Sequence, residues 1–156
     1  GKPIDTSMGF TPLEGLMMST RSGNIDPDIV IYLQKQGWEP SEIEKLLNEK
    51  SGILGVSGVS PDVRKVIAAA QDKENPLRER AGLALQMFAY QIKKQIGAYA
   101  VALGGIDGLV LTGAVSHSNL IFEMVTHGLK EVLGNFEILK IESNEELAIA
   151  EKTKGI

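Results

Sequence analysis

The chain has 156 residues, enough for about one domain with one hydrophobic core, and 43% hydrophobic with 23% charged residues is typical of a globular protein, not a disordered one. Its net charge of −4 comes from 16 basic and 20 acidic residues without a basic run, which gives no indication of nucleic-acid binding. No apolar run is long enough for a membrane span, and the absence of cysteine excludes disulfides, thiolate metal sites and a cysteine nucleophile.

The first half of the sequence predicts short helices separated by turns that contain Gly and Pro. Pro12 suits a first helical position and Thr11 suits the N-cap before it, so residues 12–18 are expected to be helical. The next predicted segments are a helix opened by Asp26-Pro27 and closed by Gly37, a helix beginning at 39–41, a glycine-rich loop at 51–58 and a helix at 60–70.

The strongest periodic pattern lies between Asn75-Pro76 and Gly104-Gly105. Apolar residues recur there every three or four positions, which places them on one face of a long helix. We expect this face to be buried against a sheet rather than to bind a ligand. The apolar positions are Leu77, Ala81, Leu85, Phe88, Ile92, Ile96, Tyr99 and Leu103.

The last third of the sequence alternates strands and helices. We expect a strand at 108–113, a turn at 113–119, a helix at 120–133, a strand at 136–141 and a last helix from Ser143. This order is typical of a parallel sheet with a right-handed crossover. Two strands make a marginal sheet, and the helices carry more apolar surface than two strands can cover, so we expect an incomplete domain.

The start of the chain supports the same expectation. Residues 1–7 contain no start methionine and begin no regular element, as in the middle of a longer polypeptide, although a trimmed terminus would look the same. The start is also polar and contains glycine, unlike a secretory signal. We therefore expect a cytoplasmic protein that binds neither membranes nor nucleic acid.

Four segments of the sequence resemble the acetate kinase family in the same order. They are DTSMGFTPLEGLMM at 5–18 with TRSGNIDP at 20–27, the stretch 51–64, YQIKKQIGAY at 90–99 and SNEEL at 143–147. The resemblance covers nearly the whole chain and corresponds to the later part of the second domain of a family enzyme. It implies an α/β fold: a partial actin-like (ribonuclease H-like) domain of the acetate and sugar kinase/Hsp70/actin superfamily, helix-rich at 1–105 and with a strand-helix-strand-helix unit at 106–156.

Enzymes of the acetate kinase family convert ATP and acetate to ADP and acetyl phosphate, reversibly and with Mg²⁺. The resemblance implies these four ligands, Mg²⁺ as cofactor and a homodimer for the complete protein. We expect this chain to be an incomplete catalytic unit that is inactive alone. Two alternatives stay open, namely a non-catalytic fragment or dimerising scaffold, and a relative that acts on propionate or butyrate.

Arg21 is the candidate catalytic residue. Phosphoryl transfer needs positive charge around the transferred group, and a planar guanidinium can hold a phosphoryl oxygen or a carboxylate at two points. The small residues on both sides of Arg21 leave it room to enter a cleft, and it matches the catalytic arginine of the family. Without the resemblance, a lone arginine in a loop is more often an ordinary surface residue.

The resemblance also implies a nucleotide-binding loop and a carboxylate linked to the metal. Gly58, Asp62, Val63 and Arg64 match the loop on the adenosine side, although a helix-starting aspartate would explain Asp62 as well. Glu145, the first acid of an Asn-Glu-Glu motif, would hold Mg²⁺ directly or through water, with Glu146 in reserve. Acidic residues are also common at helix starts for electrostatic reasons alone.

The loop at 113–119 departs from the family pattern. It reads GAVSHSN where the family has a Gly-Ile-Gly-Glu-Asn type of loop close to the nucleotide. The nucleotide contacts predicted here are Gly113, Ala114 and Ser118. Ala114 and Ser116 stand at glycine positions, and their side chains are expected to crowd the ligand. His117 stands at the position of the acid, and we expect it, like His127, to be a solvated or capping residue.

Overall fold

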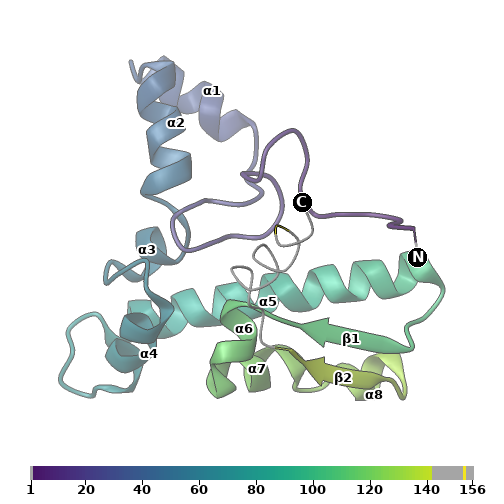
Figure 1. Ribbon diagram of the computed structural model, residues 1–156. Helices are drawn as coiled ribbons and strands as arrows, with labels where there is room; N and C mark the ends of the chain where they lie inside the picture. The colour runs from purple at the N-terminus through teal and green to yellow at the C-terminus, as the bar shows by residue number, and fades with distance from the viewer. Residues whose placement is uncertain (1, 142–152, 154–156) are drawn as a thin grey trace.

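Figure 1 shows the computed structural model of the chain, which describes residues 2–141 and 153. The elements in order are α1 (Asp28–Lys35), α2 (Pro40–Glu49), α3 (Gly52–Ser57), α4 (Val63–Gln71), α5 (Arg78–Leu103), β1 (Gly108–Leu111), α6 (Ala114–His117), α7 (Asn119–Thr126), α8 (Leu129–Leu133) and β2 (Glu137–Lys140). This helix-rich α/β arrangement confirms the predicted fold class. The last predicted helix, from Ser143, falls outside the described residues.

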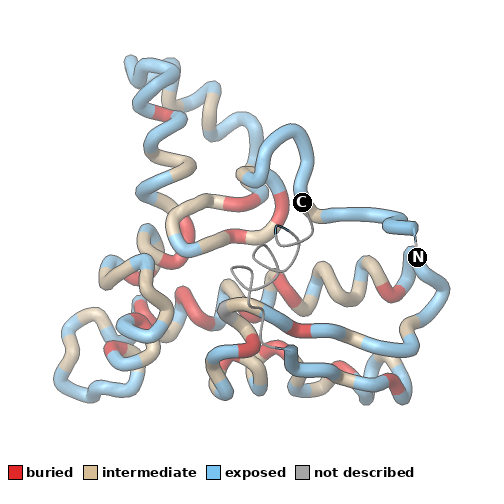
Figure 2. Tube along the Cα trace, viewed as in Figure 1, coloured by how far each residue is buried: buried red, intermediate tan, exposed pale blue. Residues whose placement is uncertain are grey.

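The long helix α5 is the element on which the others pack. Its buried face is made largely of small residues, including Ala81, Ala84 and Ala89 around Leu85. Small side chains let neighbouring helices approach closely, and α3, α4 and α7 all pack against this helix. Figure 2 shows buried residues along α5 and on the elements around it. The middle of the predicted apolar stripe, Ala81, Leu85 and Ile92, is therefore part of the core.

The partner of that stripe differs from the prediction. The main contacts of α5 are with helices and not with the sheet. The far end of the stripe is not covered either, since Leu103 is 52% exposed. A pattern of apolar residues shows which face of a helix is buried, but it carries no information on what covers that face.

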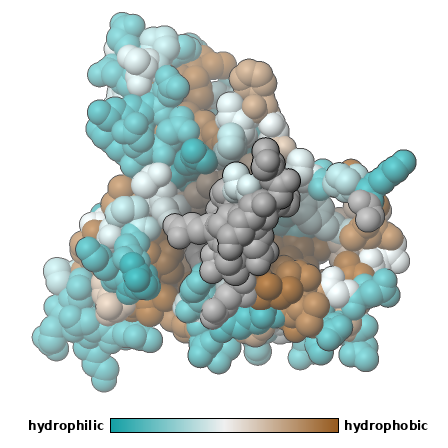
Figure 3. Space-filling model, in the orientation of Figure 1, coloured by the Kyte–Doolittle hydropathy of each residue, from teal (hydrophilic) through white to brown (hydrophobic). Residues whose placement is uncertain are grey.

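The two strands form the predicted parallel pair. Gly108 lies opposite Glu137 and Leu111 lies opposite Lys140, with α6, α7 and α8 in the connection between the strands. One face of the pair faces the core, where Leu111 is buried. Val110, Leu139 and Ile141 are exposed, and hydrophobic residues are visible beside the sheet in Figure 3.

The helix predicted at 12–18 is wrong. This segment makes a turn, in which the Glu14 amide donates to the carbonyl of Thr11 at 3.3 Å and the Leu13 amide to its hydroxyl at 3.2 Å. Gly15 prevents a helix here because its φ of 100° lies in the left-handed region. A Cβ at Gly15 would also collide with the carbonyl oxygen of Ser7.

Other element boundaries differ from the predicted ones at glycines with positive φ and at a helix N-cap. The expected loop at 51–58 contains α3, which lies between Gly52 and Gly58, both with positive φ. The expected helix at 120–133 is split into α7 and α8 at Gly128, whose φ is 78°. The expected turn at 113–119 contains α6. The helix expected from residue 60 begins later because Asp62 caps α4.

Helices α1 and α2 form an arm that projects from the rest of the molecule (Figure 1). Pro40 is at the start of α2, and Glu39 and Glu42 form a capping box there. The apolar residues of α1 are not buried. The helix ends at Lys35, and Gly37, the predicted closing residue, follows two positions later with a φ of 87°. Among the described residues, no helix is both long and apolar enough to cross a bilayer.

The packing of α5 predicts different effects for two leucines of this helix. Leu85 is 2% exposed in the core, whereas Leu83 is 50% exposed. Leu85→Ala should lower the free energy of unfolding by about 2–5 kcal/mol, because the lost contacts leave a cavity. Leu83→Ala should change it by less than about 1 kcal/mol. Urea unfolding of both variants measures this, and equal effects would contradict the central role of this face.

Candidate functional site

The loop that carries Arg21 is fixed by backbone hydrogen bonds to the start of α3. The amides of Ser51, Ile53 and Leu54 donate to carbonyls of Thr20, Met18 and Ser19, each at 2.9 Å. These bonds hold residues 18–20 in place, and the Thr20 hydroxyl adds a hydrogen bond to the carbonyl oxygen of Asn48 at 2.8 Å. The position of Arg21 is therefore set by the connection between α2 and α3.

Gly52 makes this close approach possible. A Cβ at this position would collide with the carbonyl oxygen of Met18 and would lie 2.6 Å from the carbonyl oxygen of Arg21. Its φ of 62° also disfavours any residue with a side chain. Sequence analysis did not single out Gly52, although the glycine-rich composition of 51–58 was the signal that could have pointed to it.

The Arg21 side chain is half-buried, and its Nη1 lies 3.8 Å from the sulfur of Met18. Within the described part of the chain, the only ion pair joins Asp62 and Arg64. No described carboxylate therefore forms an ion pair with Arg21.

A cavity of about 490 Å³ collects several of the residues that sequence analysis predicted. Asp62, Val63, Arg64 and Ser118 line it, although Ser118 is distant from the other three in the sequence. Ser19 of the arginine loop also lines this cavity. Pro61, Val63 and Ile67 contribute apolar side chains, and His117 completes the lining. We call it the α4–α7 cavity, because it lies where these two helices begin.

Two helix N-termini meet at the α4–α7 cavity. Asp62 caps α4, and its Oδ1 accepts a hydrogen bond from the Arg64 amide at 2.9 Å. Ser118 caps α7, and its hydroxyl accepts from the Ile121 amide at 3.3 Å. Because helix N-termini carry partial positive charge, their convergence favours an anionic group in this cavity.

Asp62 and Arg64 also form a two-point ion pair. The Arg64 Nη2 lies 2.7 Å from Oδ2 of Asp62, and its Nε donates to Oδ1 at 3.0 Å. The hydrogen bonds from the Arg64 side chain, and then from its amide, lower the pKa of Asp62 to about 2. The same pairing raises the pKa of Arg64. The Arg64 side chain is 89% exposed, so the pair is open to exchange with a ligand.

Arg21, Gly58, Gly113 and Ala114 are not among the residues that line this cavity. Gly58 ends α3 with a φ of 69°, and the nearest atoms to a Cβ there would belong to the guanidinium of Arg80. Gly113 precedes α6, and Ala114 is its first residue. Glu145 falls outside the described residues. No group of three or more acidic or histidine side chains that could hold a metal occurs among the residues described.

Two side chains of the loop at 113–118 form hydrogen bonds with the loop's own backbone. The carbonyl oxygen of Gly113 accepts hydrogen bonds from the Ser116 hydroxyl at 2.9 Å and from Nδ1 of His117 at 2.6 Å. We expected the Ser116 side chain to crowd the ligand. Instead, Ser116 is buried and does not line the cavity. His117 caps the carbonyl, in agreement with the prediction, but it also lines the cavity, which sequence analysis missed.

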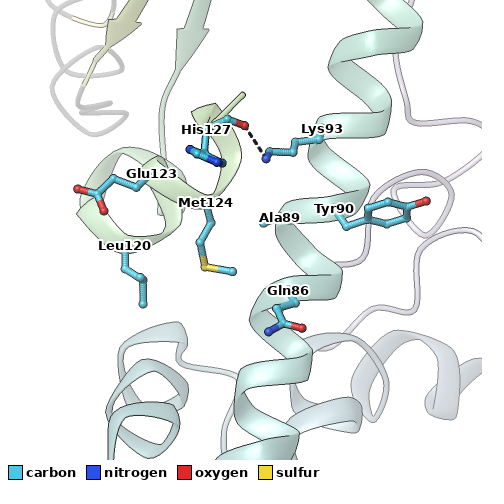
Figure 4. Close-up of a pocket in the computed structure, with 8 residues that line it drawn as sticks. All are labelled: Gln86, Ala89, Tyr90, Lys93, Leu120, Glu123, Met124 and His127. Carbon is cyan, nitrogen blue, oxygen red and sulfur yellow. Dashed lines mark hydrogen bonds between the residues drawn. The ribbon is translucent and has the colours of Figure 1, made fainter. Parts of the chain in front are cut away.

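A second cavity, of about 570 Å³, lies between α5 and α7 (Figure 4). The Nζ of Lys93 donates to the carbonyl oxygen of His127 at 2.7 Å across this space. None of the predicted site residues lines it. Its lining residues are Gln86, Ala89, Tyr90, Lys93, Leu120, Glu123, Met124 and His127.

The sequence matches the acetokinase family over residues 1–154. An acetate kinase of Caldicellulosiruptor saccharolyticus is 44% identical over 181 aligned positions, which cover 100% of the chain and 44% of the relative. Since the aligned positions outnumber the 156 residues of the chain, the relative carries additional residues within the matched region. The chain thus spans less than half the length of this relative.

Solved structures of related kinases have the same fold as the chain. A Porphyromonas gingivalis acetate kinase is 38% identical with a TM-score of 0.81, over 96% of this chain and 43% of that one. A Francisella tularensis propionate kinase is 34% identical with a TM-score of 0.83, over 98% of this chain and 44% of that one. These similarities agree with the partial actin-like fold expected from the sequence.

The pairing with Arg64 makes the titration of Asp62 a test of the cavity geometry. Its carboxyl should titrate near its lowered pKa of about 2, and Arg64→Ala should move the pKa up toward the ordinary value of 3.8. Because the folded-state value is lowered, the pairing favours folding above pH 3.8, and this contribution is lost as the pH falls toward 2. NMR titration of the carboxyl carbon measures the shift. Lys65→Ala is the matched control and should move the pKa much less, since its charge is the smallest cause.

The contact of Gly52 with the arginine loop predicts a large effect of one methyl group. Gly52→Ala should destabilise the chain by roughly 1–3 kcal/mol, because the residue would be strained and would push residues 18–21 away. Gly97→Ala is the control, since it lies within α5 with open space around a Cβ, and it should be neutral or stabilising by up to about 1 kcal/mol. Thermal unfolding measures both, and a neutral Gly52→Ala would contradict the proposed contact.

Proposed function

The chain belongs to the acetokinase family, and we propose that it forms part of an ATP:acetate phosphotransferase. The reaction moves the γ-phosphoryl group of ATP in line to a carboxylate oxygen of acetate, and it gives ADP and acetyl phosphate reversibly. Because the chain spans 44% of the length of its Caldicellulosiruptor relative, we assign the complete activity to this chain together with the missing part.

The observation that carries this proposal is the convergence of the N-termini of α4 and α7 at one cavity, next to the Arg21 loop. A nucleotide needs an apolar wall for its base and a positive field for its phosphates. The apolar residues Pro61, Val63 and Ile67 supply the first, and the two helix N-termini supply the second. Asp62 and Arg64 would contact the nucleotide after their mutual ion pair opens.

Arg21 would stabilise the transferred phosphoryl group. Its loop neighbour Ser19 lines the same cavity, and no described carboxylate pairs with the arginine. A guanidinium held by a rigid loop costs little reorganisation when negative charge moves during the transfer. The rigidity of this loop comes from its backbone bonds to α3.

Mg²⁺ would reduce the repulsion between the phosphates and the incoming carboxylate. The described residues do not form a Mg²⁺ site of their own. We therefore derive no step through the ion, and Glu145 is our proposal for the carboxylate linked to it. We further propose a cytoplasmic location and a homodimer for the complete protein, on the family resemblance alone.

Transfer to propionate is a second candidate function. The similarity to a Francisella propionate kinase, with a TM-score of 0.83, favours this candidate. The described cavity offers no separate acyl pocket by which the two acids could be told apart. A third possibility, a scaffold without catalysis, differs from both in having no need for Arg21.

Arg21→Ala should separate catalysis from a scaffold role. In a mixture of this chain with the upstream part of the Caldicellulosiruptor relative, acetyl phosphate formation from ATP, Mg²⁺ and acetate should fall by about 10²–10³-fold, because a charge that stabilises the transition state is lost. Arg78→Ala is the matched control, since Arg78 is an exposed arginine at the start of α5, and it should keep full activity.

Three results would change the proposal. Acetate-dependent turnover by the chain alone would show that its own residues suffice and that the view of an incomplete unit is wrong. Equal activity of the Arg21→Ala mixture and the parent mixture would exclude the catalytic role of Arg21. No turnover in any mixture would favour the scaffold.

A further inference from the structure

His117 lines the α4–α7 cavity, and one nitrogen of its ring is bonded to the backbone of its own loop. We propose that Nε2 of His117 accepts a hydrogen bond from the 6-amino group of adenine, so that this residue selects 6-aminopurine over 6-oxopurine nucleotides. The inference rests on the proposed function, since it assumes that the cavity holds the base of a nucleotide. His117 was expected only to be a solvated or capping residue.

The hydrogen bond to Gly113 fixes the state of the imidazole ring. Nδ1 of His117 lies 2.6 Å from the carbonyl oxygen of Gly113. A carbonyl oxygen can only accept, so Nδ1 must carry the hydrogen. In the neutral ring, the lone pair is then on Nε2, which can only accept. Among the described residues, no other hydrogen bond of this ring is found.

The same bond also limits rotation of the ring. Gly113 lies one α6 turn before His117, and its carbonyl oxygen additionally accepts from the buried hydroxyl of Ser116 at 2.9 Å. The backbone amides of Ser116 and His117 point to this oxygen as well, at 3.0 and 3.2 Å. A side chain that is already held in place loses little conformational entropy when it binds a ligand.

The other polar groups of the cavity discriminate less between purines. The hydroxyls of Ser19 and Ser118 can each donate or accept. Arg64 directs its Nε and Nη2 toward Asp62, and the Asp62 carboxylate already accepts from them and from a backbone amide. Nε2 of His117 is thus a hydrogen-bond acceptor to which no described group donates.

Adenine and guanine differ at the position that this acceptor would meet. The 6-amino group of adenine donates hydrogen bonds, whereas O6 of guanine or hypoxanthine accepts them. An amino group would pair with Nε2, but an oxygen would place two lone pairs against each other. The apolar side chains of Pro61, Val63 and Ile67 provide a surface for the flat base in the same cavity.

Two substitutions separate the two ring nitrogens. The side-chain amide of Asn can take the place of Nδ1 and keep the bond to Gly113, but His117→Asn has no acceptor at Nε2. The longer His117→Gln can place its amide oxygen near Nε2 but gives up the bond to Gly113. His127→Asn is the matched control, because His127 lies on the other cavity, between α5 and α7.

The experiment compares binding of ATP, GTP and inosine triphosphate by calorimetry at about pH 8, where ordinary imidazoles are neutral. The protein is this chain with the upstream part of the Caldicellulosiruptor relative. The parent should prefer ATP over both 6-oxo nucleotides by roughly ten-fold, the contribution of about one hydrogen bond. His117→Asn should lose most of this preference, His117→Gln should keep part of it, and His127→Asn should keep all of it.

The outcomes distinguish the inference from the function on which it rests. If the parent binds ATP without preference over inosine triphosphate, the inference is overturned whether or not the variants fold, and the proposed function stands. A folded His117→Asn variant with unchanged preference overturns it as well. If the parent binds no nucleotide, both the inference and the proposed nucleotide site are overturned. Circular dichroism of each variant shows whether it is folded.

Discussion

The close packing of helices on the small-residue face of α5 is the constraint on which the rest of the structure depends. Ala81, Ala84 and Ala89 let α3, α4 and α7 approach the same helix. Since α4 and α7 share this support, their first turns come together although they are far apart in the sequence. The cavity that contains Asp62 and Ser118 is thus a consequence of how α5 is packed. Bulky side chains along this face would separate the helices and open the cavity.

The Arg21 loop depends on a second close approach, that of Gly52 to the backbone of residues 18–21. Backbone hydrogen bonds to the start of α3 hold the loop, together with the bond from the Thr20 hydroxyl to the carbonyl oxygen of Asn48. Among the residues that the structure describes, no carboxylate pairs with Arg21, whereas Arg64 pairs with Asp62. One rigid arginine and one exchangeable arginine suit a phosphoryl-transfer site, where the transferred group needs fixed charge and the nucleotide must enter and leave.

The loop at 113–118 is held by hydrogen bonds from its own side chains. Side chains that stand at positions of family glycines and polar residues here bond to one carbonyl, that of Gly113. Ser116 thereby turns inward and leaves the cavity free. His117 points its remaining ring nitrogen away from that bond, which gives the loop a polar group of defined hydrogen-bonding character.

Elements with local signals could be predicted from the sequence: the long helix α5 from its apolar period, the parallel strands from their order, and α2 from Pro40 and its caps. The sequence also indicated Arg21, Asp62, Val63, Arg64 and Ser118 through motifs. Tertiary structure decided the turn at 12–18, the helix within 51–58 and the break at Gly128, because positive-φ glycines and close backbone contacts override local propensity. Only the tertiary structure brings His117 and Ser19 to the cavity, because this convergence follows from packing against α5. Helical periodicity in the sequence does not specify which elements share a face.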